Sequence, residues 1–239
     1  MITNIVVGAL AVNCWVYPLP APLEEDDLWA QGPWASYTGA DSAKGALCAL
    51  VDPGADPAVI TARLERLRLF PRYILLTHGH FDHVAGLAGV ASYYRDAYGL
   101  APEIAIHKGD ASSLGPASLP VHQESFRAAV GDTAYVDALW EPLPPASRLL
   151  SEGDRIGPFT TLHLPGHSPG SAGFYHAESR TLLSGDTLFN GGIGRTDLPG
   201  GDWNTLAASL QRLFRMDARV TVYPGHGSIT TIGDEQSLL

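Results

Sequence analysis

The stretch Thr77-His-Gly-His-Phe-Asp-His83 decides the fold. It directly follows the apolar run 73–76, whose aromatic and β-branched residues predict a buried strand. α/β proteins place their chemistry in loops that leave such strands, and His and Asp are good ligands for borderline divalent metals. Because neighbouring residues of a tight loop cannot all reach one ion, the first two histidines would face one point, and the aspartate and third histidine another. The stretch therefore predicts two metal positions; the alternative is an exposed, histidine-rich turn.

The composition is that of a globular protein. The 239 residues are 45% hydrophobic and 17% charged, which disfavours disorder and coiled coil and allows one large domain or two small ones. The net charge of −10, without a basic stripe, argues against a nucleic-acid partner. No apolar run approaches the roughly 20 residues that span a bilayer, so we expect no membrane partner. No basic region precedes the first apolar stretch, and Cys14 and Cys48 fit buried free thiols, so we expect a cytoplasmic protein.

The hydrophobic pattern predicts strands that alternate with helices. Strands are expected at 2–7, 12–17, 46–51, 73–76, 103–106, 159–164, 172–176, 181–184 and 220–223. Helices are expected after the N-cap residue Asp56, from 87 to Gly99, near 124–130 and after the N-cap residue Asp202, where Trp203, Leu206, Leu210, Leu213 and Phe214 share a face.

Two stretches, 18–45 and 111–148, are predicted as loop insertions because prolines, glycines and charges interrupt any regular pattern. Both alternatives stay open for these stretches: they close over a cleft, or they lie on the body of the protein. His122 lies in the second stretch without a ligand partner, which predicts a surface histidine or, alternatively, part of a flap that faces the substrate. The loop 107–110 is predicted to be structural.

A theme recurs along the chain: a short apolar strand ends in a Gly- or Pro-bearing loop that carries His or Asp. It occurs at 78–83, at His167, at Asp186 and at His226. Each isolated residue could be a satisfied buried histidine or a turn aspartate. Because the loops of a rigid sheet meet at one edge, the four together predict a single site that is assembled from distant parts of the sequence.

These motifs resemble those of the metallo-β-lactamase-fold hydrolases, and within them the glyoxalase II-like (hydroxyacylglutathione hydrolase-like) branch of short, single-domain bacterial proteins. The matching segments, in the family's order, are 77–83, 165–171, 184–189, 194–197 and 223–226. The resemblance implies an α/β (α+β) fold, the four-layer αββα sandwich, as one domain over residues 1–239. Alternating strands and helices are compatible with this architecture but do not by themselves predict it.

The resemblance also implies a dinuclear metal site. The first ion would be held by His78, His80 and His167, the second by Asp82, His83 and His226, with Asp186 as the bridge. Zinc is the first expectation for the two divalent ions, with iron or manganese as alternatives. A hydroxide that bridges the ions would attack a small-molecule thioester of the glutathione type, with Asp82 and Asp186 as the catalytic carboxylates.

Substrate recognition follows less directly from the resemblance. Arg195 aligns with a basic position that contacts glutathione in glyoxalase II; the alternative is a structural arginine paired with Asp197. Ser228 stands where the long enzymes carry a substrate-contacting tyrosine, so the acyl group and the thiol carrier stay open. The oligomeric state is open as well.

Other functions on the same fold are compatible with these residues. A persulfide dioxygenase would hold one Fe(II) with His78, His167 and Asp186, and metal content would distinguish it. Hydrolysis of another ester or a lactone is a further alternative. Many β-lactamases of this fold carry a cysteine where Asp186 stands, which disfavours that activity. A binding protein would be expected to have lost ligands, yet the full set is present.

Overall fold

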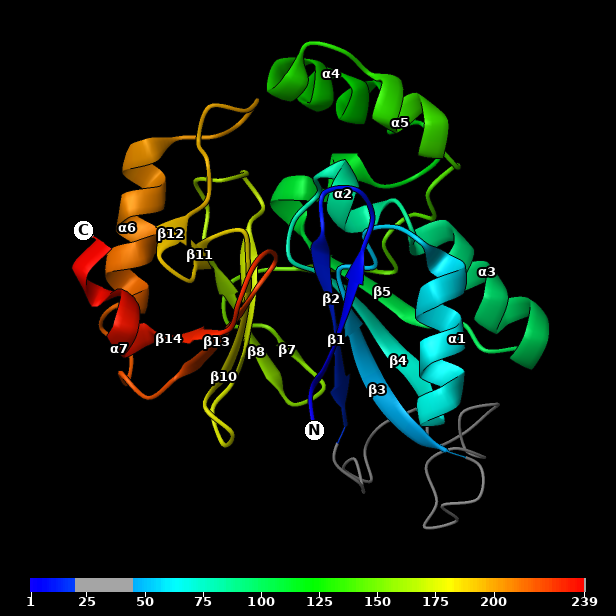
Figure 1. Ribbon diagram of the computed structural model, residues 1–239, viewed down its shortest axis with the longest axis horizontal. Coiled ribbons are helices and arrows are strands. Elements are labelled where there is room, and N and C mark those ends of the chain that lie inside the picture. The colour runs from blue at the N-terminus through cyan, green and yellow to red at the C-terminus, as the bar shows by residue number, and fades with distance from the viewer. Residues whose placement is uncertain (20–44, 239) are drawn as a thin grey trace.

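Two six-stranded sheets stand face to face, with helices on their outer sides (Figure 1). This computed structural model describes residues 1–19 and 45–238. The predicted loop insertion 18–45 therefore lies, but for its ends, outside the described residues. The layers are helix, sheet, sheet and helix, so the predicted αββα sandwich is confirmed.

The first sheet has the order β1-β2-β3-β4-β5-β6. Its strands are β1 (Thr3–Val7), β2 (Val12–Pro18), β3 (Ala46–Val51), β4 (Leu69–Leu76), β5 (Glu103–His107) and β6 (Arg148–Leu150). β1, β2 and β3 pair antiparallel, and from β3 to β6 the strands are parallel. The helices α1 (Pro57–Leu67) and α3 (Leu87–Tyr98) cover the outer face (Figure 1). The parallel half ends its strands at one edge of the sandwich, which is where the metal motif begins.

The second sheet has the order β14-β13-β10-β9-β8-β7. Its strands are β7 (Arg155–Ile156), β8 (Phe159–His163), β9 (Ala172–His176), β10 (Thr181–Gly185), β13 (Thr221–Pro224) and β14 (Thr230–Thr231). Only β10 and β13 pair in parallel, and α6 (Trp203–Leu213) covers the outer face. The remaining elements are α2 (Phe81–Val84), a 3-10 helix (Lys108–Ser113), α4 (Leu119–Val130), α5 (Ala134–Leu139), the hairpin β11 (Leu188–Phe189) and β12 (Gly192–Ile193), α7 (Ile232–Glu235) and a 3-10 helix (Gln236–Leu238).

The strand before the metal motif is longer than the pattern predicts. β4 begins at Leu69, although a proline follows at position 71. The pairing register with β3 shifts at this point, where Cys48 faces Pro71 and Ala49 faces Tyr73. Such an irregularity leaves one residue unpaired and can hold a proline, which has no N–H for the ladder. The rest of the strand is buried, as predicted.

The two predicted N-caps differ. Asp202 accepts a hydrogen bond from the backbone N–H of Thr205 at 2.7 Å and caps α6 as predicted. Asp56 precedes α1 in a left-handed conformation and does not cap it; its carboxylate accepts instead from the N–H of Gly8, at 2.8 Å. The predicted apolar face of α6 is also wrong at Trp203: this first residue of the helix is exposed, and the buried face begins at Leu206.

The stretch 111–148 is not a simple loop insertion, because it contains α4 and α5. α4 begins at Leu119, five residues before the predicted helix, with Pro120 in its first turn. The surface prediction for His122 is wrong: the ring is buried against Phe81 and donates from Nε2 to the carbonyl of Ser113 at 2.9 Å. The sequence missed this because the packing partner lies in the metal motif, far away along the chain.

Two smaller predictions concern the cysteines and the membrane. Cys14 and Cys48 are free and buried, as predicted, and burial raises the pKa of both thiols. None of the helices in the described part of the chain is long and apolar enough to cross a membrane.

Candidate metal centre

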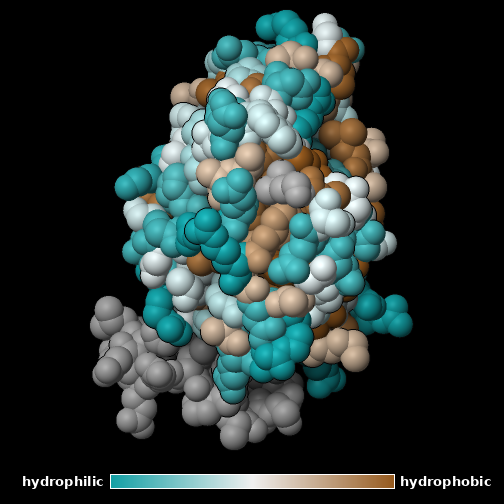
Figure 2. Space-filling model, turned by 90° about the vertical axis from the view of Figure 1, so that its left-hand side faces the viewer, coloured by the Kyte–Doolittle hydropathy of each residue, from teal (hydrophilic) through white to brown (hydrophobic). Residues whose placement is uncertain are grey.

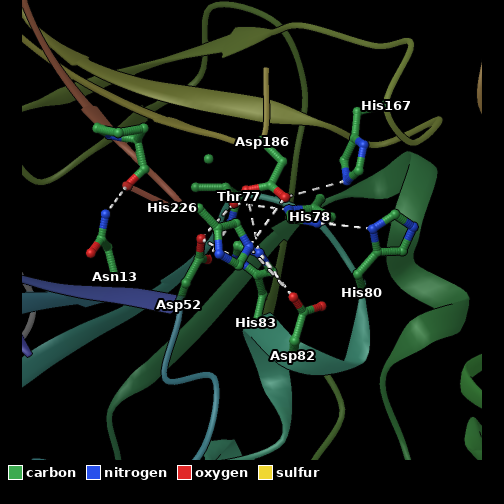
Figure 3. A network of polar contacts seen from close by, with 12 residues as sticks. Asn13, Asp52, Thr77, His78, His80, Asp82, His83, His167, Asp186 and His226 are labelled. Atoms are coloured by element: carbon green, nitrogen blue, oxygen red, sulfur yellow. Dashed lines mark hydrogen bonds and ion pairs between the residues drawn. The ribbon is translucent and has the colours of Figure 1, made fainter. Parts of the chain in front are cut away.

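Four loops meet at one edge of the sandwich, and each follows a strand. The loop after β4 supplies His78 and His80 and leads into α2, which carries Asp82 and His83; the loops after β8, β10 and β13 supply His167, Asp186 and His226. In Figure 3 these side chains point toward one another from both sheets. The structure therefore brings together every residue that the sequence singled out as a metal ligand.

The side chains form two adjacent groups. In the first, donor atoms of His78, His80 and His167 lie within 4.8 Å of one another; in the second, those of Asp82, His83 and His226 do. These groups match the two ligand sets that the family resemblance implies. Their roles as ligands stay a prediction, but the geometry needed for them is present.

Asp186 lies between the two groups. Its Oδ2 is 3.7 Å from Nε2 of His167 in the first group and 3.5 Å from Nε2 of His226 in the second. Its Oδ1 is 3.4 Å from Nε2 of His83. One carboxylate thus faces both groups, which is the position that a bridging ligand requires.

The charge states suit cation binding. Burial and the neighbouring His167 lower the pKa of His80 to about 3, and burial with the other histidines holds the pKa of His78 well below its usual range. Burial opposes ionisation of Asp186, but the histidines around it, His83 foremost, lower its pKa. Neutral imidazoles and ionised carboxylates are the protonation states that bind divalent metals.

The surroundings of His83 provide a test of whether these residues fit divalent cations. Burial lowers the pKa of His83, yet the carboxylates of Asp186 and Asp82 outweigh it and raise the pKa well above its usual range. Nε2 of His83, Nε2 of His167 and Oδ1 of Asp186 are buried with no hydrogen-bond partner. Buried polar atoms in folded proteins are nearly always paired. A pair of divalent cations would satisfy all three atoms, so these residues fit the metals that the family implies.

The sequence missed a carboxylate behind the centre. Asp52 is fully buried and accepts three hydrogen bonds: from Nδ1 of His83 at 2.9 Å, from the hydroxyl of Thr77 at 2.6 Å and from the Thr77 N–H at 2.8 Å. A carboxylate in this position fixes the histidine tautomer and turns Nε2 toward the metal. The sequence analysis did not single out Asp52, although its place directly after the buried strand β3 was a usable signal.

A second buried carboxylate joins two of the ligand loops. Asp110 accepts from the N–H of Gly79 at 2.8 Å, from the N–H of Gly170 at 2.6 Å and from the hydroxyl of Ser168 at 2.7 Å. A Cβ on Gly170 would lie 2.4 Å from the backbone nitrogen of Asp110, so only glycine fits this approach. The structural prediction for the loop 107–110 agrees with this arrangement.

The remaining ligand loops are also held from behind. Asn13 on β2 donates to the carbonyls of Pro224 and Gly227, at 3.0 and 2.9 Å, on either side of His226 (Figure 3). His167 donates from Nδ1 to the carbonyl of Arg195 at 2.8 Å. Asn13 carried no sequence signal, because its role depends on a strand and a loop that lie 211 residues apart.

Arg195 lies at the edge of the cavity above the centre. Its guanidinium donates two hydrogen bonds, each of 2.7 Å, to the carboxylate of Asp197, and both side chains are exposed. This is the pair that the sequence offered as the alternative to substrate binding. Contact with a substrate carboxylate stays a prediction, and it would have to displace Asp197.

Comparison with known families decides the assignment. The profile of the Metallo-beta-lactamase superfamily matches residues 43–226, a range that contains every predicted ligand. The chain belongs to the metallo-beta-lactamase superfamily. Among superfamily members, it is 36% identical over 193 residues to hydroxyacylglutathione hydrolase GloC of Haemophilus influenzae, covering 79% of this chain and 84% of the relative.

Two solved structures of the superfamily resemble the chain over nearly its whole length. TTHA1623 in a di-iron-bound form is 34% identical, with a TM-score of 0.72 over 98% of this chain and 97% of the other. The B3 metallo-beta-lactamase BLEG-1 is 32% identical, with a TM-score of 0.71 over 98% and 96%. The protein is therefore a superfamily hydrolase by sequence and fold, and its metal centre fits divalent ions.

Proposed function

We propose that this protein is a dinuclear metallohydrolase of thioesters, similar to hydroxyacylglutathione hydrolase. The observation that carries the proposal is the pair of adjacent ligand groups with Asp186 between them, in which three buried polar atoms have no hydrogen-bond partner. The similarity to GloC supports a thioester, and the di-iron form of TTHA1623 supports two ions. Zinc is the metal we expect first, with iron or manganese as alternatives.

The reaction adds water to the acyl carbon and breaks the carbon–sulfur bond, which gives a carboxylic acid and a thiol. When bound, a pair of divalent ions supplies a water of lowered pKa and stabilises negative charge on the carbonyl oxygen. His78, His80 and His167 would hold one ion, and Asp82, His83 and His226 the other.

The chain's own residues set the geometry of this step. Asp82 and Asp186 both line the cavity, where their ionised carboxylates would offset the charge of the ions and could accept a hydrogen bond from the attacking water. Asp52 keeps Nε2 of His83 directed at the centre. The thiolate leaves without a strong acid because the pKa of a thiol is modest, about 8.5 for cysteine.

The test is hydrolysis of S-lactoylglutathione by the metal-replete protein, followed by release of free thiol, together with metal analysis of the same sample. We expect turnover, two ions per chain, and loss of activity on chelation with recovery on adding metal back. Two bound ions with no thiol released from any thioester would overturn the proposal. A single iron with O₂ consumed in the presence of a persulfide would favour the dioxygenase instead.

A further inference from the structure

The cavity above the metal centre has a polar floor and an apolar wall. Its volume is about 270 Å³, near the lower end of ligand cavities, which begin at roughly 300 Å³. The polar floor consists of His80, Asp82, His167, Asp186 and His226. The wall comes from four separate places in the chain, namely the turn between β1 and β2, the start of α2, the second half of α4 and the loop after Arg195; its apolar residues are Leu10, Phe81, Phe126, Ala129, Val130 and Leu198.

Part of this wall is unusually exposed for large apolar side chains. Leu10 is 44% exposed and Val130 is 60% exposed, and both border the cavity. In Figure 2, brown atoms gather on the upper right of the face shown, among teal and white side chains. Apolar side chains that gather at the mouth of a polar site mark the place where an apolar part of a ligand is buried.

The same lining offers little to a charged group of the substrate. Apart from the histidines, Arg195 is the only cation among the residues that line the cavity, and Asp197 already engages its guanidinium. A carrier with carboxylates at its ends would gain affinity from free, bidentate cations. The lining therefore favours an uncharged group next to the reacting carbonyl.

A second, polar cavity indicates which side of the thioester the apolar wall receives. It has a volume of about 140 Å³, shares His80 and Ser125 with the first cavity, and is lined further by the hydroxyl groups of Ser112 and Ser113 and the carboxylates of Asp110 and Glu124. A thiol carrier with polar groups can form hydrogen bonds with these hydroxyl groups, whereas an alkyl acyl chain gains only from contact with apolar area. The thiol side thus belongs toward the hydroxyl groups, and the acyl side toward the apolar wall.

We propose that the preferred substrates are thioesters whose acyl group is apolar, uncharged and a few carbons long, and that Leu10 and Val130 set this preference. The inference rests on the proposed function. Within thioester hydrolysis, it assigns the preference to simple alkanoyl thioesters, with the acyl chain against the apolar side chains Leu10 and Val130 and the thiol toward Ser112 and Ser113.

The experiment measures thiol release from the S-acetyl, S-butanoyl and S-hexanoyl esters of 2-mercaptoethanol by the metal-replete protein. Each methylene that the wall buries should raise kcat/KM about fourfold. In the double variant Leu10→Ser/Val130→Ser, the ratio of kcat/KM for hexanoyl over acetyl should fall roughly tenfold. The matched control is Val6→Ser/Val59→Ser, which changes two exposed valines that do not line the cavity and should keep the wild-type ratio.

The outcomes separate this inference from the proposed function. A kcat/KM that is flat or falls with acyl length would overturn the inference, as would an unchanged ratio in the Leu10 and Val130 variant. Faster turnover of S-lactoylglutathione than of the hexanoyl ester would also overturn it, while leaving the thioesterase proposal intact. No turnover of any thioester with metal bound would overturn the proposed function itself.

Discussion

At the metal centre three of the four ligand loops are held from behind by a side chain on another element, whereas the helices above it, α4 and α5, have few buried side chains. Asp52, Asp110 and Asn13 fix three of these loops with buried or half-buried hydrogen bonds. In α4 only His122 is buried, and in α5 only Val136. The contacts between the two helices are the exposed bond from Gln123 to Asp137 and the stacked rings of Phe126 and Tyr135.

This difference indicates a division of roles. A metal centre must hold its donor atoms to within a few tenths of an ångström, so its supports are redundant and rigid. The cavity wall only has to present apolar area, and weaker packing suffices for it. Substitutions behind the centre should therefore affect metal and catalysis, and substitutions in α4 should affect stability and substrate choice.

The largest effect should come from Asp186→Ala. This removes the only carboxylate that faces both ligand groups, so we expect a fall in kcat of at least about a thousandfold and less than two bound ions per chain. Activity assays and metal analysis of the same preparation check it. Near-normal turnover in this variant would show that the two groups do not act together.

Asp52→Asn should give the next largest effect. The amide keeps the shape but weakens the acceptor for His83, so metal affinity should fall about 10- to 100-fold with the fold intact. Metal titration against a competing chelator measures this. Asp56→Asn is the matched control, because Asp56 lies in the same turn between β3 and α1 and contacts Gly8 rather than a histidine; equal losses in both variants would contradict a positioning role for Asp52.

His122→Ala tests α4, which lies above the metal centre. Loss of a buried ring that packs on Phe81, with the Ser113 carbonyl left unpaired, should lower the free energy of unfolding by about 2 kcal/mol while two ions stay bound. Thermal or denaturant unfolding of the metal-loaded protein measures it. The neighbouring Val121→Ala, at a partly exposed position of α4, should lose far less. If His122→Ala instead released metal without loss of stability, the assignment of metal binding to the centre and of stability to α4 would be wrong.

The smallest effect should come from Arg195→Ala. The guanidinium is exposed and already paired with Asp197, and exposed ion pairs contribute little, so we expect less than about a threefold change in kcat/KM for S-lactoylglutathione. The backbone carbonyl that orients His167 remains. A loss of more than about tenfold, confined to substrates with a carboxylate, would instead establish the predicted substrate contact.

The sequence by itself determined which residues form the candidate metal centre. The predicted ligands stand at the ends of short apolar strands, and strand, turn and predicted ligand are neighbours along the chain, so local pattern and composition single them out. The same holds for the strands that carry them and for α3, whose predicted end at Gly99 is confirmed by a left-handed glycine.

Only the tertiary structure decided what supports and covers that centre. Asp52, Asp110 and Asn13 contact loops that are distant in sequence, and His122 is buried only because α4 lies over Phe81. The bulge that admits Pro71 to β4 depends on its partner strand. Such roles arise from pairings between remote segments, and a local pattern carries no record of which remote segment will be its neighbour.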